Sequence, residues 1–296
     1  MKVFAVDGNY YLHRAFSVSA TTRRIEHLEK NTLDLFLKFV CNDALHLKAT
    51  HILVCFDSKR SWRHDLYKEY KATRNKGATE VTTREGQTIK LEITAGSLVK
   101  KAKMVCELAG LPVAQKKGYE GDDLLGSVAV SVPCKCVIGT RDKDVHQSVT
   151  EDGRVTIWWP SEKVLMDWKA VIKKFGVKPT MIAEFLALCG DGADNIPGVD
   201  GIGPGTATKW LMTHGSVSKA VKADPAVKKK LAPHKAMFSL CKTLTTVKRD
   251  AVFKLDDLVP QPLDHDLQNH VWQIPNALKE LSDARKYASR KGLFGK

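Results

Sequence analysis

Three short apolar runs, each leading into aspartate, constrain the fold of this chain more than any other feature. The runs are Val3–Val6, Ile52–Phe56 and Cys136–Ile138. The first two are unbroken and rich in β-branched or aromatic residues, which is typical of strands buried on both faces of a parallel sheet. Apolar residues at helical spacing between and after the runs predict the helices Leu33–Leu47, Ser97–Leu108 and Leu124–Val130. Alternating strands and helices indicate an α/β fold with right-handed crossovers.

Each predicted strand ends at acidic residues. Asp7 follows the first strand, Asp57 follows the second, and Asp142 and Asp144 follow the third after a three-residue spacer. Because the carboxyl ends of parallel strands share one edge of a sheet, and ligands bind there, we expect these side chains to lie close together.

Two more acidic groups accompany them. Glu120, Asp122 and Asp123 open a predicted helix, where acids are also favoured by the helix dipole, so simple capping explains that group equally well. Asp191 and Asp194 lie among glycines, where aspartate often only forms turns.

Converging carboxylates repel one another, and some become protonated unless cations are present. Oxygen ligands favour hard divalent ions, so the acids predict Mg²⁺ or Mn²⁺, and no set of His or Cys residues argues for zinc. Two such ions activate a water and stabilise the leaving oxygen of a phosphodiester. The acids therefore predict a metal-dependent phosphodiesterase with two ions.

Charge and hydropathy point to the partner and the compartment. The chain of 296 residues has a formal net charge of +14, which favours polyanions, although a solvated basic surface without a partner would look the same. No segment has the length of apolar sequence that a signal peptide or a membrane helix needs. Seven cysteines without a C-x-x-C pair indicate a reducing, cytoplasmic setting. Nothing in the sequence suggests more than a monomer.

The chain changes character near residue 180. Met181–Cys189 predicts a helix, a glycine-rich stretch runs from Gly190 to Gly205, and helices and loops follow from Thr206 onward. We therefore expect an α/β core over residues 1–180 and a mainly helical, DNA-binding region over residues 181–296.

Six ordered blocks of sequence resemble the 5′-nuclease or flap endonuclease family, which includes the 5′–3′ exonuclease domain of bacterial DNA polymerase I and stand-alone bacteriophage 5′-nucleases. The resemblance runs from Val3 to about Asp250. The blocks are Val6–Ala15, Phe56-Asp57, Trp62–Arg74, Gly118–Gly126, Asp142–Asp144 and Gly190–Ala207.

The resemblance implies a PIN-like core with a mainly parallel central sheet flanked by helices, and a helical arch at about residues 62–100. It implies that nine acids hold metal, in one cluster of Asp7, Asp57, Glu120, Asp122 and Asp123 and a second of Asp142, Asp144, Asp191 and Asp194. It also implies that Lys71 and Arg74 contact the scissile phosphate, with Arg14 nearby.

Basic and aromatic residues of the arch block fit nucleic acid. Lys68, Lys71 and Arg74 recur at helical spacing and would face one phosphate backbone, and Tyr67 and Tyr70 would offer stacking surfaces. Without the resemblance, a solvated basic face with two core tyrosines is the better interpretation.

The glycine-rich block resembles a helix–three-turn–helix motif over about residues 182–215. In the family this motif grips duplex DNA, often with bound K⁺. Its glycines allow the backbone to turn tightly near a phosphate, and the residues that would contact DNA are Gly198, Gly201, Gly203, Gly205, Thr208 and Lys209.

The family implies hydrolysis near the 5′ ends, flaps or nicks of DNA, or of RNA–DNA hybrid, leaving 5′-phosphates. A stand-alone nuclease suits a phage replication enzyme in a bacterial cytoplasm, with replication proteins as partners. One rival is an RNase of the PIN-like class, against which the glycine-rich motif argues. The other is a non-catalytic DNA-binding module, in which clustered acids would only destabilise the fold.

Overall fold

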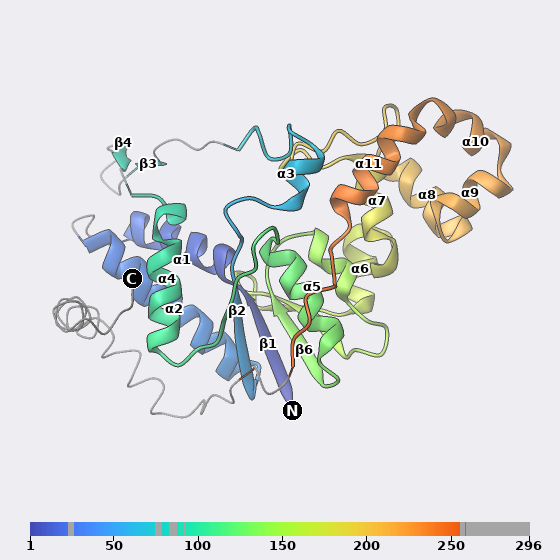
Figure 1. The fold of residues 1–296 in the computed structure, drawn as a ribbon. Coiled ribbons are helices and arrows are strands. Elements are labelled where there is room, and N and C mark those ends of the chain that lie inside the picture. The colour runs from blue at the N-terminus through green and yellow to red at the C-terminus, as the bar shows by residue number, and fades with distance from the viewer. Residues whose placement is uncertain (23–26, 75–78, 83–87, 92, 255–257, 259–296) are drawn as a thin grey trace.

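A six-stranded, mainly parallel sheet forms the centre of the molecule (Figure 1). The computed structural model describes residues 1–22, 27–74, 79–82, 88–91, 93–254 and 258. The strand order is β5-β2-β1-β6-β7-β8, and only β8 is antiparallel to its neighbour. The strands are β1 (Lys2–Asp7), β2 (His51–Cys55), β5 (Val113–Ala114), β6 (Lys135–Gly139), β7 (Val155–Trp159) and β8 (Val164–Met166). The predicted parallel sheet is confirmed, and the three predicted strands are adjacent at its centre.

Helices cover both faces of the sheet. On one face, a core that includes Phe4, Phe36 and Phe56 packs under three helices, which are α1 (Gly8–Thr22), α2 (Leu28–His46) and α4 (Ala95–Leu108). The other face packs against α5 (Gly121–Ser131), α6 (Trp168–Phe175) and the short 3-10 helix η2 (Asp144–Ser148). This arrangement leaves the carboxyl ends of the parallel strands along one edge.

A helical region projects beyond one end of the sheet, as expected for the chain after residue 180 (Figure 1). The helix α7 leads into it, and α11 packs back against α7. Its elements are η3 (Pro179–Met181), α7 (Ile182–Cys189), α8 (Pro204–His214), α9 (Val217–Ala223), α10 (Pro225–Leu231), η4 (Ala232–His234) and α11 (Lys235–Thr245).

The predicted arch differs from expectation at its start. The helix α3 (Trp62–Leu66) has only five residues, and residues 67–74 then form turns. Lys71 has a φ of 55°, in the left-handed region. An antiparallel hairpin of β3 (Thr79–Thr82) and β4 (Thr88–Leu91) precedes α4. The helical spacing inferred for Lys68, Lys71 and Arg74 is therefore wrong, because the chain between them does not form a helix.

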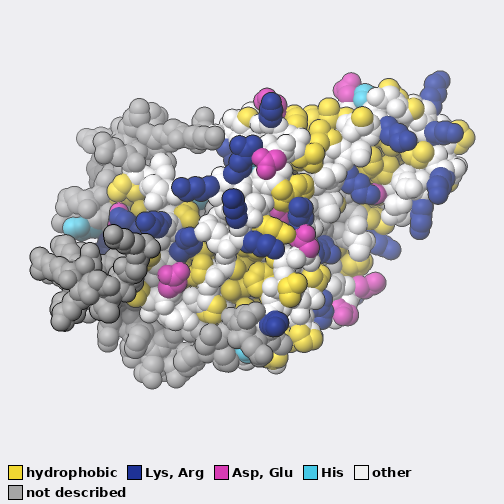
Figure 2. Space-filling model, in the orientation of Figure 1, with side chains coloured by type: hydrophobic (Ala, Val, Ile, Leu, Met, Phe, Trp, Pro, Cys, Tyr) yellow, Lys and Arg dark blue, Asp and Glu magenta, His cyan; other side chains and the backbone are white. Residues whose placement is uncertain are grey.

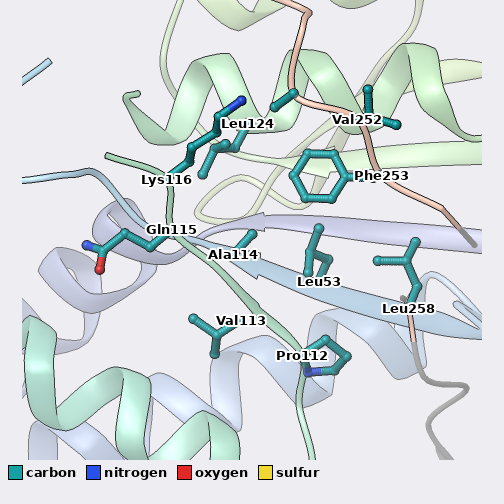
Figure 3. A pocket seen from close by; sticks show the side chains of 11 residues that line it. Leu53, Pro112, Val113, Ala114, Gln115, Lys116, Leu124, Val252, Phe253 and Leu258 are labelled. Carbon is teal, nitrogen blue, oxygen red and sulfur yellow. The ribbon is translucent and has the colours of Figure 1, made fainter. Parts of the chain in front are cut away.

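An apolar cavity of about 480 Å³ lies at the β5 edge of the sheet (Figure 3). Leu53 and Val113 line it from the sheet side, and Phe253 and Leu258 come from the last described segment of the chain. This segment therefore packs back across the first domain. The basic tail Arg285–Lys296 lies outside the described residues. No described helix has the length and apolar character that crossing a membrane would demand.

Candidate active site

Four of the expected acids line one cavity at the carboxyl edge of the sheet. Asp7 ends β1, Asp57 follows β2, Asp122 opens α5 and Asp142 follows β6, and all four border a cavity of about 340 Å³. We call it the acidic cavity. Three cations, Lys71, Arg74 and Arg141, also line it, together with Asn9, Tyr10 and His13. The structure therefore brings these four acids together, as the parallel topology predicts.

Backbone and side-chain donors fix the first two acids. The Tyr10 amide and the Thr140 hydroxyl donate to the two oxygens of Asp7, at 2.9 and 2.8 Å. Asp57 accepts from the Gly121 amide at 2.6 Å and from the Asn9 side-chain amide at 2.9 Å. A Cβ atom at Gly121 would lie 3.2 Å from Asp57 Oδ1, so the glycine permits this close approach. These bonds hold the carboxylates in place without neutralising their charge.

Burial makes ionisation of these acids unfavourable. Burial, with Asp57 and Asp142 adding negative charge nearby, raises the pKa of Asp7 to about 7. Burial also raises the pKa of Asp122 well above its usual range, with contributions from Asp142 and Asp7. Burial likewise raises the pKa of Asp142. A bound cation would favour the charged forms and remove this cost.

Glu120 and Asp123, expected in the same cluster, instead bind buried cations. Arg63 is 2% exposed, and its Nη1 and Nη2 donate to Asp123 at 2.8 and 2.9 Å. Arg63 Nη1 also donates to Glu120 at 3.1 Å, and Lys71 Nζ donates to Glu120 at 2.9 Å. Asp123 further accepts from the Trp62 indole and the Lys248 amide.

Asp123 differs from the four acids that line the acidic cavity, and its expected role as a metal ligand stays a prediction. It is fully buried, lies outside the acidic cavity, and both of its oxygens already accept hydrogen bonds. Its position at the third residue of α5's first turn aims it at α3, not at the sheet edge. It therefore anchors Arg63.

In the second expected cluster of acids, some carboxylates form ion pairs with basic side chains and one has an oxygen without a hydrogen-bond partner. Lys143 Nζ donates to Asp191 at 2.7 Å, and Arg74 Nη2 donates to Asp194 at 2.5 Å. Although burial acts to raise it, Lys71 and Arg74 lower the pKa of Asp194. Asp144 differs, because its Oδ1 is buried without a hydrogen-bond partner. Burial, followed by the charges of Asp142, Asp194 and Asp191, raises its pKa well above the usual range.

The carboxylate oxygens are chemically suited to a divalent cation, but the acids do not surround one point in this structure. Within the described part of the chain, no three acidic, His or Cys side chains stand in an arrangement that could hold a metal ion. Glu120, Asp191 and Asp194 instead form ion pairs with basic side chains. The partnerless oxygen of Asp144 and the raised pKa of Asp122 are what an oxygen-ligated cation would satisfy.

Tyr70 and Arg14 do not lie where the resemblance to the family leads us to expect them. Tyr70 is 3% exposed, and its hydroxyl lies 2.9 Å from Glu120 and 2.8 Å from Asp194, so it is not available to stack on a base. Arg14 does not line the acidic cavity, because its guanidinium lies over the Phe39 ring and near the Pro160 carbonyl. Lys68 is exposed and Tyr67 is half-buried.

The glycine-rich block forms a turn between α7 and α8. Gly198 has a φ of 76°, and a Cβ there would lie 2.4 Å from the Gly190 amide nitrogen, so no other residue fits. Gly201, Gly203 and Gly205 are exposed, and nothing lies within 4 Å of a Cβ added to any of them. Pro204 begins α8, and Lys209 is exposed while Thr208 is half-buried against Gly176. The turn offers open backbone at the start of a helix.

Sequence reasoning missed three residues that shape the site. Arg63 and Lys143 bind expected acids, and Ser61 donates to Glu120 at 3.1 Å. Tyr70 was expected to stack on bases, but its hydroxyl donates to an expected acid. Arg63 and Tyr70 lie inside the block Trp62–Arg74, which resembles the family. Nothing in the sequence of this block distinguishes a buried arginine from the exposed cations beside it. The roles of Arg63 and Tyr70 depend on contacts with Glu120 across 57 and 50 positions of sequence.

Comparison with known proteins divides the chain into two matched regions. Residues 2–176 match the family model described as "5'-3' exonuclease, N-terminal resolvase-like domain". Residues 177–266 match the model described as "5'-3' exonuclease, C-terminal SAM fold".

Individual relatives agree with these models. The 5'-3' exonuclease of Aquifex aeolicus is 28% identical over 99% of both chains. The DNA polymerase I of Mycobacterium leprae is 32% identical over 88% of this chain, which spans only 29% of that enzyme. Among solved structures, a bacteriophage T5 flap endonuclease in a complex with DNA and metal ions superposes with a TM-score of 0.66 at 16% identity, over 93% of this chain and 98% of the other.

Proposed function

Because the chain belongs to the 5′-3′ exonuclease family, we propose that it is a structure-specific 5′-nuclease. Its substrate would be DNA, or RNA–DNA hybrid, with a 5′ end, flap or nick. Water would attack a phosphodiester near that end and leave a 5′-phosphate and a 3′-hydroxyl. The observation that carries the proposal is the acidic cavity, in which Asp7, Asp57, Asp122 and Asp142 face Lys71 and Arg74.

The acids of this cavity would hold Mg²⁺ or Mn²⁺, with Asp144 contributing its unpartnered oxygen. Two such ions, when bound, supply an activated water and charge stabilisation at the leaving oxygen. The T5 flap endonuclease, which resembles this chain in fold, is recorded with DNA and metal ions, and this supports a metal-dependent reaction. The all-oxygen donor set favours Mg²⁺ or Mn²⁺ over zinc.

Lys71 and Arg74 would move from carboxylate to phosphate when substrate binds. Both now pair with Glu120 or Asp194 at the rim of the cavity. A phosphodiester that enters between them would offer a competing anion, and the charge that develops in the transition state would strengthen the new contact. The guanidinium of Arg14 lies over the Phe39 ring, so it would have to leave this position to approach the reacting phosphate.

Duplex DNA would bind at the turn between α7 and α8. The exposed backbone at Gly201, Gly203 and Gly205 and the start of α8 suit a phosphate, and K⁺ would help to neutralise it. Lys209 and Lys68 are exposed and would contact phosphates on either side. Lys and Arg side chains also gather over the outer helices of this region (Figure 2).

The proposal is tested with a 5′-end-labelled flap substrate and a matching nicked duplex. Cleavage near the junction or the 5′ end should require Mg²⁺ and be lost in EDTA. Asp122→Asn should lower kcat by about 10³-fold, because it removes an acid on which the reaction depends. Glu151→Gln is the matched control, since Glu151 is exposed and distant from the cavity.

Binding without cleavage under every divalent ion would overturn the nuclease proposal and leave a DNA-binding module. Cleavage of single-stranded RNA in preference to the flap would instead favour the PIN-like RNase. Product length on the two substrates separates flap cutting from end-wise digestion.

A further inference from the structure

Three cations line the acidic cavity, and one of them, Arg141, is paired differently from the other two. Lys71 and Arg74 form ion pairs with buried carboxylates. Arg141 Nη2 instead pairs with Glu162 Oε1 at 3.0 Å, and both of these side chains are more than one-third exposed. Releasing Arg141 to a substrate would leave an acid in solvent, whereas releasing Lys71 or Arg74 would leave a buried acid without its counter-charge. Arg141 is therefore the cation of this cavity that transfers to a phosphate at the lowest cost.

An aromatic ring holds the Arg141 side chain in place. The Arg141 guanidinium carbon lies 4.1 Å from the centre of the ring of Trp159, the last residue of β7. Arginine stacks well on indole rings, and this contact leaves the N–H groups at the edge of the guanidinium to bind oxygen acceptors. Trp159 Nε1 in turn donates to His146 Nε2 at 3.1 Å. The ring under Arg141 is thus itself fixed by a hydrogen bond.

The buried side chain of His146 sets the orientation of the Trp159 ring. His146 Nδ1 lies 3.0 Å from the carbonyl oxygen of Asp142 and 3.2 Å from that of Lys143. Since a carbonyl oxygen only accepts, Nδ1 carries the proton, and Nε2 is then the acceptor that the indole N–H requires. The platform under Arg141 is therefore tied to the backbone that carries Asp142, an acid of the cavity.

We propose that Arg141, positioned by Trp159 and His146, binds the phosphate next to the scissile one in the strand that is cleaved. The inference rests on the proposed function, in which Lys71 and Arg74 contact the scissile phosphate. All three cations border one cavity of about 340 Å³, which is too small for a duplex, so they would meet the same strand. Because Arg141 follows β6 and the other two follow α3, we assign it to a neighbouring phosphate.

This arrangement predicts an effect on substrate binding and not on the chemical step. A guanidinium that is held on a ring and weakly paired makes its contact before the reaction begins, so the substrate and the transition state benefit alike. Loss of Arg141 should therefore raise KM and leave kcat nearly unchanged. A purely structural role would give the opposite result, because a displaced Asp142 would lower kcat.

The test compares Arg141→Gln with Lys174→Gln. Lys174 Nζ lies 5.7 Å from the centre of the same Trp159 ring, but Lys174 does not line the acidic cavity, so its variant is a matched control for the loss of one positive charge. Steady-state kinetics on the flap substrate in Mg²⁺ would give KM and kcat. Fluorescence anisotropy with the same substrate in EDTA would give Kd without cleavage.

We expect Arg141→Gln to raise KM and Kd about 10-fold and to change kcat by less than about 2-fold, because a charge-assisted hydrogen bond to the substrate is lost. Lys174→Gln should change each value by less than about 2-fold. Trp159→Leu should raise Kd about 3-fold, because it removes the ring, and Trp159→Phe should restore most of the affinity. Glu162→Gln should lower Kd about 2-fold, and this gain should disappear when Arg141→Gln is also present.

Single uncharged linkages locate the phosphate that Arg141 binds. Each linkage near the scissile bond is replaced in turn by a methylphosphonate, and Kd in EDTA is measured for the wild type and for Arg141→Gln. At a linkage beside the scissile one, the replacement should weaken binding by the wild type about 10-fold and leave binding by the variant unchanged.

A fall in kcat with an unchanged KM in Arg141→Gln would overturn the proposal and show that Arg141 only positions Asp142. Equal losses in Arg141→Gln and Lys174→Gln would overturn it too, and so would equal sensitivity of the wild type and Arg141→Gln to every methylphosphonate. A protein that cleaves nothing with any divalent ion would defeat the nuclease proposal, but the Kd values in EDTA would still decide whether Arg141 binds a phosphate. The two proposals therefore fail separately.

Discussion

The acidic cavity and the acid network behind it solve the same electrostatic problem in different ways. In the network, Glu120, Asp123 and Asp194 are buried, and each receives a hydrogen bond from Arg63, Lys71 or Arg74. In the cavity, Asp7 and Asp122 have raised pKa values, because burial is not offset by a bonded cation. The first group carries its own counter-charge, whereas the second is charged at neutral pH only at a cost.

We propose that this difference separates acids that stabilise the fold from acids that are ready to bind a ligand. A carboxylate saturated by arginine contributes to the fold and is costly to disturb. A carboxylate that is buried, fixed by hydrogen bonds and left without a cation is available to a metal ion. Burial alone does not distinguish them, since Asp123 and Asp144 are both buried, but their partners do.

The largest effect should come from removing the buried cation of the network. Arg63→Met would leave Asp123 and Glu120 buried without their main partner, so we expect a loss of about 3–5 kcal/mol in the free energy of unfolding. Arg60→Met is the control, because the Arg60–Asp65 pair is exposed and should contribute little. Urea denaturation measures both. Equal stability of the two variants would show that the network does not hold α3 to α5.

The next largest effect should be a dependence of folding stability on pH, and it should come from the acids of the acidic cavity. The pKa of Asp7 is about 7 in the folded protein against 3.8 as its ordinary value. Below the lower value both states are protonated. As pH rises from about 4 to 7, the unfolded chain loses this proton first, so folding stability falls, by roughly 2–4 kcal/mol.

Denaturation in EDTA at pH 5 and pH 8 measures this dependence, and Asp7→Asn should flatten it. Asp194 should act in the opposite direction, because its pKa is lowered and its contribution is lost as pH falls. A wild-type protein that gains stability between pH 5 and pH 8 in EDTA would contradict the assignment of Asp7 as an uncompensated acid.

A smaller effect should follow from the unpartnered oxygen of Asp144. If divalent ions bind at these acids, saturating Mg²⁺ or Mn²⁺ should raise the free energy of unfolding by about 2–3 kcal/mol at 100 times the Kd. Asp144→Asn should remove much of this gain, while Asp152→Asn, on the exposed turn before β7, should keep it. Thermal unfolding with and without the ion measures the difference. An unchanged gain in Asp144→Asn would exclude Asp144 from the ligand set.

The same comparison explains what the sequence predicts well. Position along the chain places Asp7, Asp57 and Asp142 correctly, because an unbroken apolar strand followed by an acid fixes both burial and edge in a parallel sheet. The helix α1, which follows Asp7 in the first crossover, was not predicted, because its apolar residues are mixed with Asn, His and Ser. The strands β7 and β8 were also missed.

Partner identity could not be predicted, because it depends on contacts between distant segments. Asp122 and Asp123 are adjacent in sequence, yet one lines the cavity and the other binds Arg63. The sequence predicts that Tyr70 stacks on bases, beside Lys68 and Lys71, but turns at residues 67–74 direct its hydroxyl into the acid network. The rotation of one residue along a helix separates Asp122 from Asp123, and a left-handed turn redirects Tyr70. Local composition predicts neither.

The smallest effect tests where the boundary between the two groups lies. Lys143 is about one-third exposed and pairs with Asp191, an acid of the expected second cluster. Lys143→Gln should lower the free energy of unfolding in EDTA by less than about 1 kcal/mol, because solvent screens the exposed ammonium group.

The same variant tests metal binding. If Lys143 pairs with an Asp191 oxygen that a divalent ion also uses, the variant should bind Mn²⁺ about 3- to 5-fold more tightly, since the competing cation is gone. Calorimetric titration of Mn²⁺ measures this, with Lys169→Gln as the control. Weaker binding in Lys143→Gln would instead show that the lysine orients Asp191 for its ligand, and Asp191 would then belong with the structural acids that carry their own counter-charge.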